Sequence, residues 1–397
     1  MRHSLIPLPG VVNQPACYHH PVTEFESVTE NSLLKAALIE RIRAHGDISF
    51  RDFMATVLYH PGMGYYASAR DPIGRDADYV TSAELSPIFG AMLGRQLREM
   101  WEALGSPPEI DLVEAGAGSG VLARDILAWA QRTAPDFFAA VHYKIIEPHA
   151  EAIVRQLERL PKSSEITHSP GLPSNVKGVI FSNELLDAMP VHRVAVENGV
   201  LREIYVTHDG ARFTEQLRDP APELIRYFEA LGLMPGEGCR AEVNLAALDW
   251  LGTAAASLNL GFLLTIDYGY EAADLYAPWR TDGTLLAFYR QNPSTDLYAR
   301  IGRQDLTTHV DFTALRLVGE VNGLRTLGLV TQSQFLENLG ITEALATPPD
   351  STGLEEYAAR RRAITELLDP GGLGRIRVLI QAKGVGDVRL TGLASAG

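Results

Sequence analysis

The stretch Ile110-Asp-Leu-Val-Glu-Ala-Gly-Ala-Gly-Ser-Gly-Val121 decides the fold of this chain. Its apolar first half ends in Glu114 and predicts a buried strand, and a helical pattern follows the last glycine. Between them stand Gly116, Gly118 and Gly120, and glycine lets the backbone turn sharply and lets a ligand approach closely. Because free N–H groups point outward at the start of a helix, the stretch predicts a site for a nucleotide-like cofactor.

The spacing of the glycines indicates which cofactor this turn would hold. A dinucleotide fingerprint has its last glycine three positions after the second, and Val121 occupies that place here. The spacing therefore disfavours a pyrophosphate, and with it a dehydrogenase. It favours S-adenosylmethionine, which has an adenosine part and one carboxylate. A Gly-rich turn that holds no ligand is the alternative.

A second apolar run, Val141-His-Tyr-Lys-Ile-Ile-Glu147, also ends in an acid. A carboxylate at the end of the second strand can accept hydrogen bonds from both hydroxyls of a ribose. We therefore expect Glu147 to bind the cofactor, together with Glu114 and the three glycines of the turn.

The composition limits the class of protein. A chain of 397 residues allows one large domain or one domain with a sizeable insertion, and 46% apolar residues allow a substantial core. No run of 18 apolar residues is present, so no transmembrane span is expected. A net charge of −14 argues against a nucleic-acid partner, because contact with phosphates needs clustered Lys and Arg.

The two cysteines and the first residues bear on location. Cys17 and Cys239 are the only cysteines of the chain. So few cysteines suggest a reducing compartment without a disulfide framework or a zinc cluster, and no metal site is predicted. The first ten residues contain neither the apolar region of a signal peptide nor the Arg-rich helix of a transit peptide. These features predict a cytoplasmic protein.

The pattern along the chain predicts an α/β fold in two parts. Residues 1–105 form an N-terminal helical region that covers the cleft, and 106–397 form the cofactor-binding domain, with a partly antiparallel insertion at about 190–245. The expected helices are 31–45, 50–58 and 88–104, and the expected strands are 110–114, 142–147, 165–168, 177–182, 262–267, 328–332 and 376–382. Residues 1–30 are expected to be irregular, and the tail from 388 to be frayed.

Polar residues directly follow the buried strand that ends at Ser182. Asn183 offers a donor and an acceptor, and Glu184 and Asp187 would share one face of a helical turn. Two carboxylates on one face attract a guanidinium, whose planar fork binds carboxylates in bidentate fashion. An ordinary first helical turn, in which acids stabilise the N-terminus, is the alternative. Asp267 ends another strand, and His309 and Glu242 are further candidates for contact with a substrate.

Several blocks of the chain together resemble the MidA-like family of class I S-adenosylmethionine-dependent methyltransferases. The resemblance runs from about Leu33 to Gly384. It is carried by Leu58-Tyr-His-Pro61, Gly64-Tyr-Tyr66, Thr81-Ser82, Glu84 to Gly90, Glu114 to Gly120, Ile146-Glu147, Ser182 to Arg193, Ile266 to Gly269, Gly283-Thr-Leu285 and Asp305 to Phe312. The glycine block occurs throughout the superfamily, whereas Asn-Glu-Leu-Leu-Asp and Thr-His-Val-Asp-Phe are more specific. Ala77 and Gln291 depart from the family, which usually has glycine and histidine there.

The resemblance implies a Rossmann-like fold with a mostly parallel seven-stranded sheet, N-terminal helices and an insertion. It implies that Ser82 and Glu84 line the cofactor cleft and that Asn183 and Glu184 lie between cofactor and substrate. Mitochondrial members of the family assist assembly of respiratory complex I, and one methylates a protein arginine. The resemblance thus implies a protein substrate, with a complex I subunit or its bacterial counterpart as the candidate.

We therefore predict direct transfer of a methyl group to an arginine nitrogen, with Glu184, aided by Asp187, orienting the substrate. Asn183 and His309 complete the predicted catalytic set. Two alternatives stay open, namely an assembly factor that binds a partner protein while retaining the cofactor site, and an enzyme acting on a lysine or a small metabolite. The sequence does not predict the oligomeric state.

Overall fold

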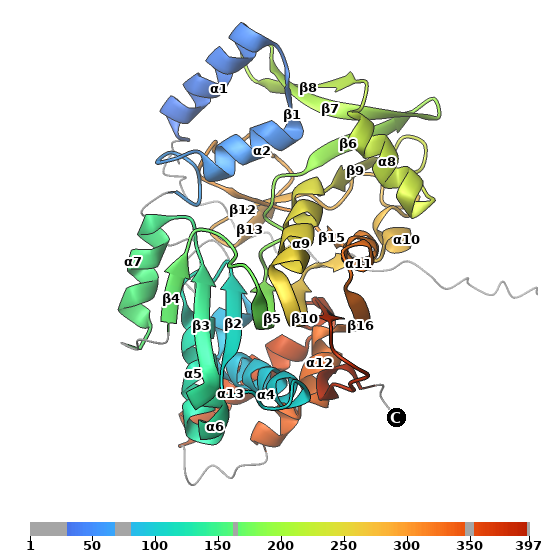
Figure 1. Ribbon diagram of the computed structural model, residues 1–397. Coiled ribbons are helices and arrows are strands. Elements are labelled where there is room, and N and C mark those ends of the chain that lie inside the picture. The colour runs from blue at the N-terminus through green and yellow to red at the C-terminus, as the bar shows by residue number, and fades with distance from the viewer. Residues whose placement is uncertain (1–29, 68–80, 162–165, 346–352, 395–397) are drawn as a thin grey trace, which may run out of the picture.

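The computed structural model describes residues 30–67, 81–161, 166–345 and 353–394. A seven-stranded sheet lies at its centre, in the order β16-β17-β10-β5-β2-β3-β4 (Figure 1). Its strands are β2 (Ile110–Ala115), β3 (Val141–Ile146), β4 (Ile166–Ser169), β5 (Val176–Asn183), β10 (Leu258–Asp267), β16 (Arg325–Thr331) and β17 (Arg377–Lys383). Each of the seven strands predicted for the sheet is confirmed, including β4.

The direction of the strands confirms the predicted fold class. β2 runs parallel to both β3 and β5, and β5 runs parallel to β10. β17 is antiparallel to both of its neighbours, β10 and β16, so one strand breaks the parallel order. Leu112 and Val113 of β2 are fully buried, as expected for a parallel strand covered on both faces.

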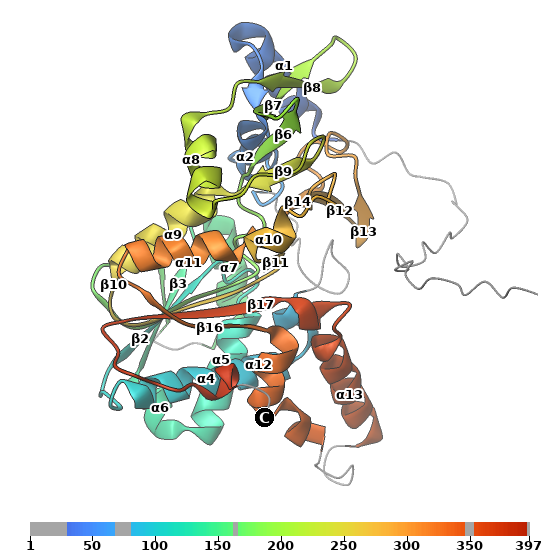
Figure 2. The same ribbon diagram turned by 90° about the vertical axis from the view of Figure 1, so that its right-hand side faces the viewer.

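Helices cover both faces of this sheet (Figure 2). One face packs against α4 (Pro87–Ala103), α5 (Val121–Thr133), α6 (Pro135–Ala140), α12 (Gln332–Asn338) and α13 (Leu354–Leu368), and the other against α9 (Leu245–Ser257) and α11 (Phe312–Val321). α7 (Ala150–Arg159) follows β3. Gly120 leads into α5 with a φ of +83°, a conformation that glycine adopts without a steric penalty.

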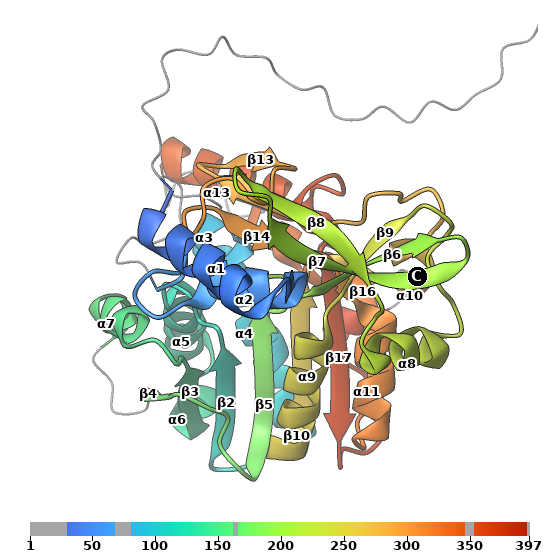
Figure 3. The ribbon, with the colours of Figure 1, turned by 90° about the horizontal axis from the view of Figure 1, so that it is seen from above.

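A second, antiparallel sheet lies beyond the carboxyl ends of the central strands (Figures 1 and 3). It contains β1 (Ile48–Ser49), β6 (His192–Glu197), β7 (Val200–His208), β8 (Phe213–Arg218) and β9 (Arg240–Val243). Side chains of α1 (Ser32–His45) and α2 (Phe50–Tyr59) pack with one part of it, and α8 (Pro222–Leu231) packs with another. The predicted hairpin and the helices at 31–45 and 50–58 are confirmed.

The helices of residues 1–105 therefore serve two different parts of the molecule. α1 and α2 form a core with the second sheet, whereas α4 packs on α5 and the central sheet. α3 (Ser82–Leu85) connects to α4, and Thr81 caps it by accepting a hydrogen bond from the Glu84 backbone N–H.

Shorter elements fill the remaining chain. They are β11 (Gly269–Tyr270), α10 (Ala272–Leu275), β12 (Leu286–Tyr289), β13 (Asn292–Ser294), β14 (Asp305–Thr307), β15 (Val310–Asp311), η1 (Ile341–Leu345), η3 (Leu373–Arg375) and η4 (Thr391–Leu393). The predicted fraying from 388 is wrong up to 394, because Leu390 is buried and Thr391 donates hydrogen bonds to Glu99.

Some predictions concern residues that lie outside the described ranges. Residues 1–29, and with them the irregular start, lie outside the described residues, and so does Ala77. Within the described ranges, no helix combines the length and the apolar character needed to cross a membrane.

Candidate active site

Four strand ends meet at one edge of the central sheet. The register pairs Ala115 with Ile146 and with Ser182, and it pairs Asn183 with Ile266. The strand order reverses between β2 and β5, since β3 and β4 extend the sheet on one side and β10 on the other. In open α/β sheets a ligand binds at such a reversal, outside the carboxyl ends.

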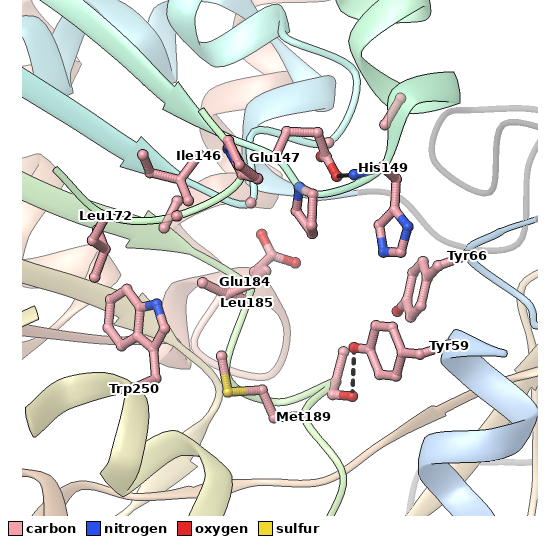
Figure 4. Close-up of a pocket in the computed structure, with 18 of the residues that line it drawn as sticks. Tyr59, Tyr66, Ile146, Glu147, His149, Leu172, Glu184, Leu185, Met189 and Trp250 are labelled. Carbon is pink, nitrogen blue, oxygen red and sulfur yellow. Dashed lines mark hydrogen bonds between the residues drawn. The ribbon is translucent and has the colours of Figure 1, made fainter. Parts of the chain in front are cut away.

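A cavity of about 440 Å³, here the glycine-loop cavity, lies at this reversal (Figure 4). Strand ends, the glycine turn and α9 supply its walls. The lining residues are Tyr59, Tyr66, Ala115, Gly116, Gly118, Ile146, Glu147, Pro148, His149, Ala152, Arg155, Pro170, Gly171, Leu172, Glu184, Leu185, Ala188, Met189, Trp250 and Thr253. Most of these side chains are apolar, and the two carboxylates among them are Glu147 and Glu184.

The glycine turn keeps its side of this cavity free. Gly116 and Gly118 have φ values of +71° and +53°, which disfavour other residues. A Cβ on Gly116 would lie 2.7 Å from Cδ1 of Leu185, closer than carbon atoms tolerate. The backbone can thus border a ligand directly, as a cofactor turn requires.

Glu147 is fastened to the same turn. One carboxylate oxygen accepts the backbone N–H of His149 at 3.0 Å, and the other accepts the Gln156 amide at 3.3 Å. The Gln156 amide also donates to the carbonyl oxygen of Gly118 at 3.0 Å. Burial raises the pKa of Glu147. Glu147, Gly116 and Gly118 therefore lie in one site.

A second cavity of about 440 Å³, here the carboxylate cavity, adjoins the first. It is lined by Tyr66, Glu184, Asp187, Tyr268, Thr284, Leu286, Phe288, Gln291, Asp305, Thr307, Thr308, His309, Gly372, Leu373 and Arg375. Glu184 and Tyr66 line both cavities. A group held in one cavity can therefore meet a group held in the other beside Glu184.

Glu184 is held in an unusual backbone conformation. Its φ is +49°, and the backbone after β5 turns without forming a helix, so the expected helical turn is wrong. The Glu184 N–H donates to the Ile266 carbonyl oxygen at 2.8 Å. Its carboxylate accepts the Ser82 backbone N–H at 3.0 Å and the Asn183 amide at 3.2 Å. Strain of this kind is concentrated at functional sites.

Asp267 holds the turn that follows β5. Its side chain is buried and accepts the backbone N–H groups of Leu185 at 3.2 Å and Leu186 at 2.8 Å. These N–H groups therefore belong to a turn that aims Glu184 at the cavities. Asp267 lines neither cavity, so it positions this turn from behind.

Three close carboxyl groups share a dry environment. Burial raises the pKa of Glu184 to about 8 and of Asp267 to about 7, and it raises that of Asp187 as well. The charge of Asp267 adds to the effect on the other two groups. A cation entering the carboxylate cavity would favour the ionised forms.

His309, a predicted catalytic residue, lines the carboxylate cavity. Its ring stacks on Tyr268, with centroids 6.4 Å apart and planes at 10°. Burial lowers its pKa to about 3, helped by the charges of Arg375 and Arg280, so the imidazole is neutral at physiological pH. Among the described residues its Nδ1 has no hydrogen-bond partner.

Other predicted residues lie outside both cavity linings. Glu114 is buried and accepts the Tyr143 hydroxyl at 2.7 Å, and Gly120 opens α5. The carboxylate of Glu84 accepts the Ser119 hydroxyl, and Ser82 supports Glu184. The Asn183 amide likewise donates to the Glu184 carboxylate. The Glu242 carboxylate accepts the Thr284 backbone N–H at 2.8 Å.

Residue-by-residue reasoning missed the aromatic and acidic wall opposite Glu184. The Tyr66 hydroxyl donates to Asp305 at 2.9 Å, and both residues line the carboxylate cavity. The Tyr59 hydroxyl donates to the Ala188 carbonyl oxygen at 2.9 Å (Figure 4). Tyr66 and Asp305 stand in blocks that carry the family resemblance, which was the available signal. No pattern indicated Arg375.

Comparison with known proteins identifies the family. Residues 92–330 match the model of a family described as "Putative S-adenosyl-L-methionine-dependent methyltransferase". The chain therefore belongs to this family of S-adenosylmethionine-dependent methyltransferases, as its motifs predicted.

Named relatives and one solved structure agree. The mitochondrial protein arginine methyltransferase NDUFAF7 of Xenopus tropicalis is 31% identical over 80% of this chain and 77% of its own. Its Drosophila melanogaster homologue is 28% identical over 92% and 88%. A Burkholderia thailandensis protein crystallised with S-adenosyl-homocysteine is 31% identical, with a TM-score of 0.84 over 94% of this chain and 97% of that one. S-adenosylmethionine is thus the cofactor.

Proposed function

We propose that this methyltransferase transfers a methyl group to an arginine side chain of a protein. The observation that carries the proposal is the carboxylate cavity, which opens onto the glycine-loop cavity beside Glu184. Three carboxylates, those of Glu184, Asp187 and Asp305, line it. A guanidinium is a planar cation that binds such groups through paired hydrogen bonds.

The glycine-loop cavity suits the cofactor. Gly116 and Gly118 line this cavity without side chains, and Glu147 offers carboxylate oxygens to a ribose. Leu172 and Trp250 provide apolar and aromatic surface for a purine. When bound, S-adenosylmethionine supplies a methyl group already activated by a positively charged sulfur.

In the carboxylate cavity, side chains of this protein would hold the guanidinium and accept its proton. Glu184 and Asp187 hold the guanidinium so that one nitrogen faces the glycine-loop cavity, and the cation lowers their pKa values as it binds. A nitrogen that gains a methyl group must release a proton, since free arginine has a pKa above about 12. Glu184 is placed to accept this proton, because its carboxylate lies where the two cavities meet.

The names of two relatives support the same substrate class. Those of Xenopus tropicalis and Drosophila melanogaster are called protein arginine methyltransferases. The family resemblance makes a respiratory complex I subunit, or its bacterial counterpart, the first substrate to examine. We keep the cytoplasmic location as a proposal, supported by the free buried thiol of Cys239.

Mass spectrometry of reaction products tests the proposal. The purified protein is incubated with S-adenosylmethionine and a cell extract depleted of small molecules, and methylated residues are compared with those from the Glu184→Gln variant. Methylarginine that depends on Glu184 is the expected result. Methyllysine, or transfer only in undepleted extract, would contradict it. A variant that transfers nothing but fully restores a deletion strain would favour the assembly-factor alternative.

A further inference from the structure

A third cavity of about 120 Å³ adjoins the carboxylate cavity. We call it the arginine cavity, and its lining residues are Tyr268, Gly269, Tyr270, His309, Thr331, Arg375 and Arg377. Tyr268, His309 and Arg375 line both cavities. A substrate that fills the carboxylate cavity can therefore extend into the arginine cavity.

Among the residues that the structure describes, the two arginines of this cavity have no acidic partner. Within the described part of the chain, neither Arg375 nor Arg377 forms an ion pair or a side-chain hydrogen bond. The buried Arg193, by contrast, has Glu215 at 2.5 Å and Glu242 at 3.8 Å. The guanidinium groups of Arg375 and Arg377 are thus available for a ligand.

The backbone places these side chains at a fixed point. Arg375 ends η3, and Arg377 opens β17, where the register pairs it with Asp267 on β10 and Thr331 on β16. Arg375 is exposed and Arg377 is half-buried. Both lie at the rim of the site on the central sheet and not on a remote surface.

Cationic side chains gather around the arginine cavity. Arg280 lies over the Tyr270 ring at 4.7 Å, so a third cation borders the arginine cavity. The charges of Arg375 and Arg280 both lower the pKa of His309, which separates the two cavities as a neutral ring. The carboxylates thus line the carboxylate cavity, whereas Arg375 lines both cavities and further cationic groups lie at the arginine cavity.

We propose that Arg375 and Arg377 bind a carboxylate of the substrate, supplied by an acidic residue near the methylated arginine. The inference rests on the proposed function, since it assigns the guanidinium to the carboxylate cavity. Because the protein has a net charge of −14, most of its surface repels an acidic peptide segment. The two arginines give this rim a local positive charge that can attract such a segment. Two guanidinium groups that line one small cavity suit a carboxylate, which accepts paired hydrogen bonds and carries the opposite charge.

Calorimetric titration with defined peptides tests this inference. The full-length protein, saturated with S-adenosyl-homocysteine, is titrated with peptides that contain one arginine and either aspartate or asparagine at each neighbouring position in turn. We expect one aspartate position to tighten binding about tenfold over asparagine. The double variant Arg375→Gln/Arg377→Gln should lose that preference. Arg361→Gln/Arg362→Gln removes the same charge from α13 outside both cavities and should keep it.

Each result is decisive. Equal binding of aspartate and asparagine peptides by the unmodified protein would overturn the inference, as would a preference that survives in the Arg375→Gln/Arg377→Gln variant. Free arginine is titrated in a separate experiment. If it binds as tightly as the best peptide and loses affinity in that variant, its own carboxylate is the ligand, and the peptide assignment is wrong. Binding alone decides these outcomes, so methyl transfer to the same peptides tests the proposed function separately.

Discussion

The glycine-loop cavity and the carboxylate cavity have the same volume but differ in construction. The first is mostly apolar, and its polar anchor, Glu147, is bonded to residues near it in the chain. The second contains three carboxylates, two from the turn after β5 and a third, Asp305, from a distant segment, where it accepts a hydrogen bond from Tyr66. The comparison teaches that a common cofactor is held by local motifs, whereas the substrate is selected by long-range assembly.

Glu184 joins the two cavities and has features of both. It follows a central strand directly, yet its conformation depends on Ser82 and Ile266 from other parts of the chain. If the comparison is right, a change in one cavity should affect only one of the two ligands. The variants below test that separation.

The largest effect is expected for Gly118→Val. A branched side chain at a φ of +53° strains the turn and occupies the glycine-loop cavity, so affinity for S-adenosylmethionine should fall by about 100-fold or more. Calorimetry measures it. Gly199→Val is the control, because Gly199 has a φ of +73° in a hairpin with open space around it. Equal losses in both variants would mean that general strain explains the result.

The pH dependence of transfer is expected to follow Glu184. Its pKa is raised to about 8, so the ionised form that holds a guanidinium increases about tenfold per pH unit below that value. kcat/KM for an arginine peptide should therefore rise up to about pH 8 and then level off. A profile that is flat between about pH 6 and pH 8 would contradict the assignment. Affinity for S-adenosylmethionine, measured over the same range, controls for loss of cofactor.

Asp305→Asn should weaken the substrate alone. The variant removes one charge from the carboxylate cavity, and KM for the peptide should rise about tenfold while cofactor affinity stays unchanged. Steady-state kinetics with each ligand varied in turn separates the two constants. Asp296→Asn, at an exposed position outside both linings, should change neither. A weakened cofactor in the Asp305→Asn variant would break the proposed division.

The smallest expected effect is on stability. Between pH values of about 4.5 and 8, the folded state holds a proton on Glu184 that the unfolded state has lost, so stability falls as the pH rises through this range. Glu184→Gln carries no charge there, and its Tm should exceed that of the unmodified protein by about 2 °C at alkaline pH. Thermal scans should show this difference vanishing near pH 4.5. The exposed Glu337→Gln should show no such trend.

The central sheet and the glycine-loop cavity could be predicted because their signals are local. Apolar runs ending in Glu114 and Glu147 mark strand ends, and parallel strands bring those ends to one edge. Even the weak strand at 165–168 follows from the need for a neighbour to β3.

The carboxylate cavity could be predicted only in part. The sequence indicated Glu184, Asp187 and His309, because each follows a strand or belongs to a specific motif. It did not indicate the turn at Glu184, where φ is positive. The turn there is held by Asp267 at the end of β10, whose carboxylate accepts the N–H groups of Leu185 and Leu186. Tyr66 and Arg375 come from the two ends of the chain, so no local pattern could place them there.

The most direct test of the central claim combines binding and transfer in the Glu184→Gln variant. Calorimetry with S-adenosylmethionine and methyl transfer to an arginine peptide are measured on the same preparation. We predict cofactor affinity within about threefold of the unmodified protein and transfer reduced by about 100-fold or more. Unchanged transfer would contradict the role of Glu184, and a loss of transfer fully explained by lost cofactor affinity would contradict the separation of the two cavities.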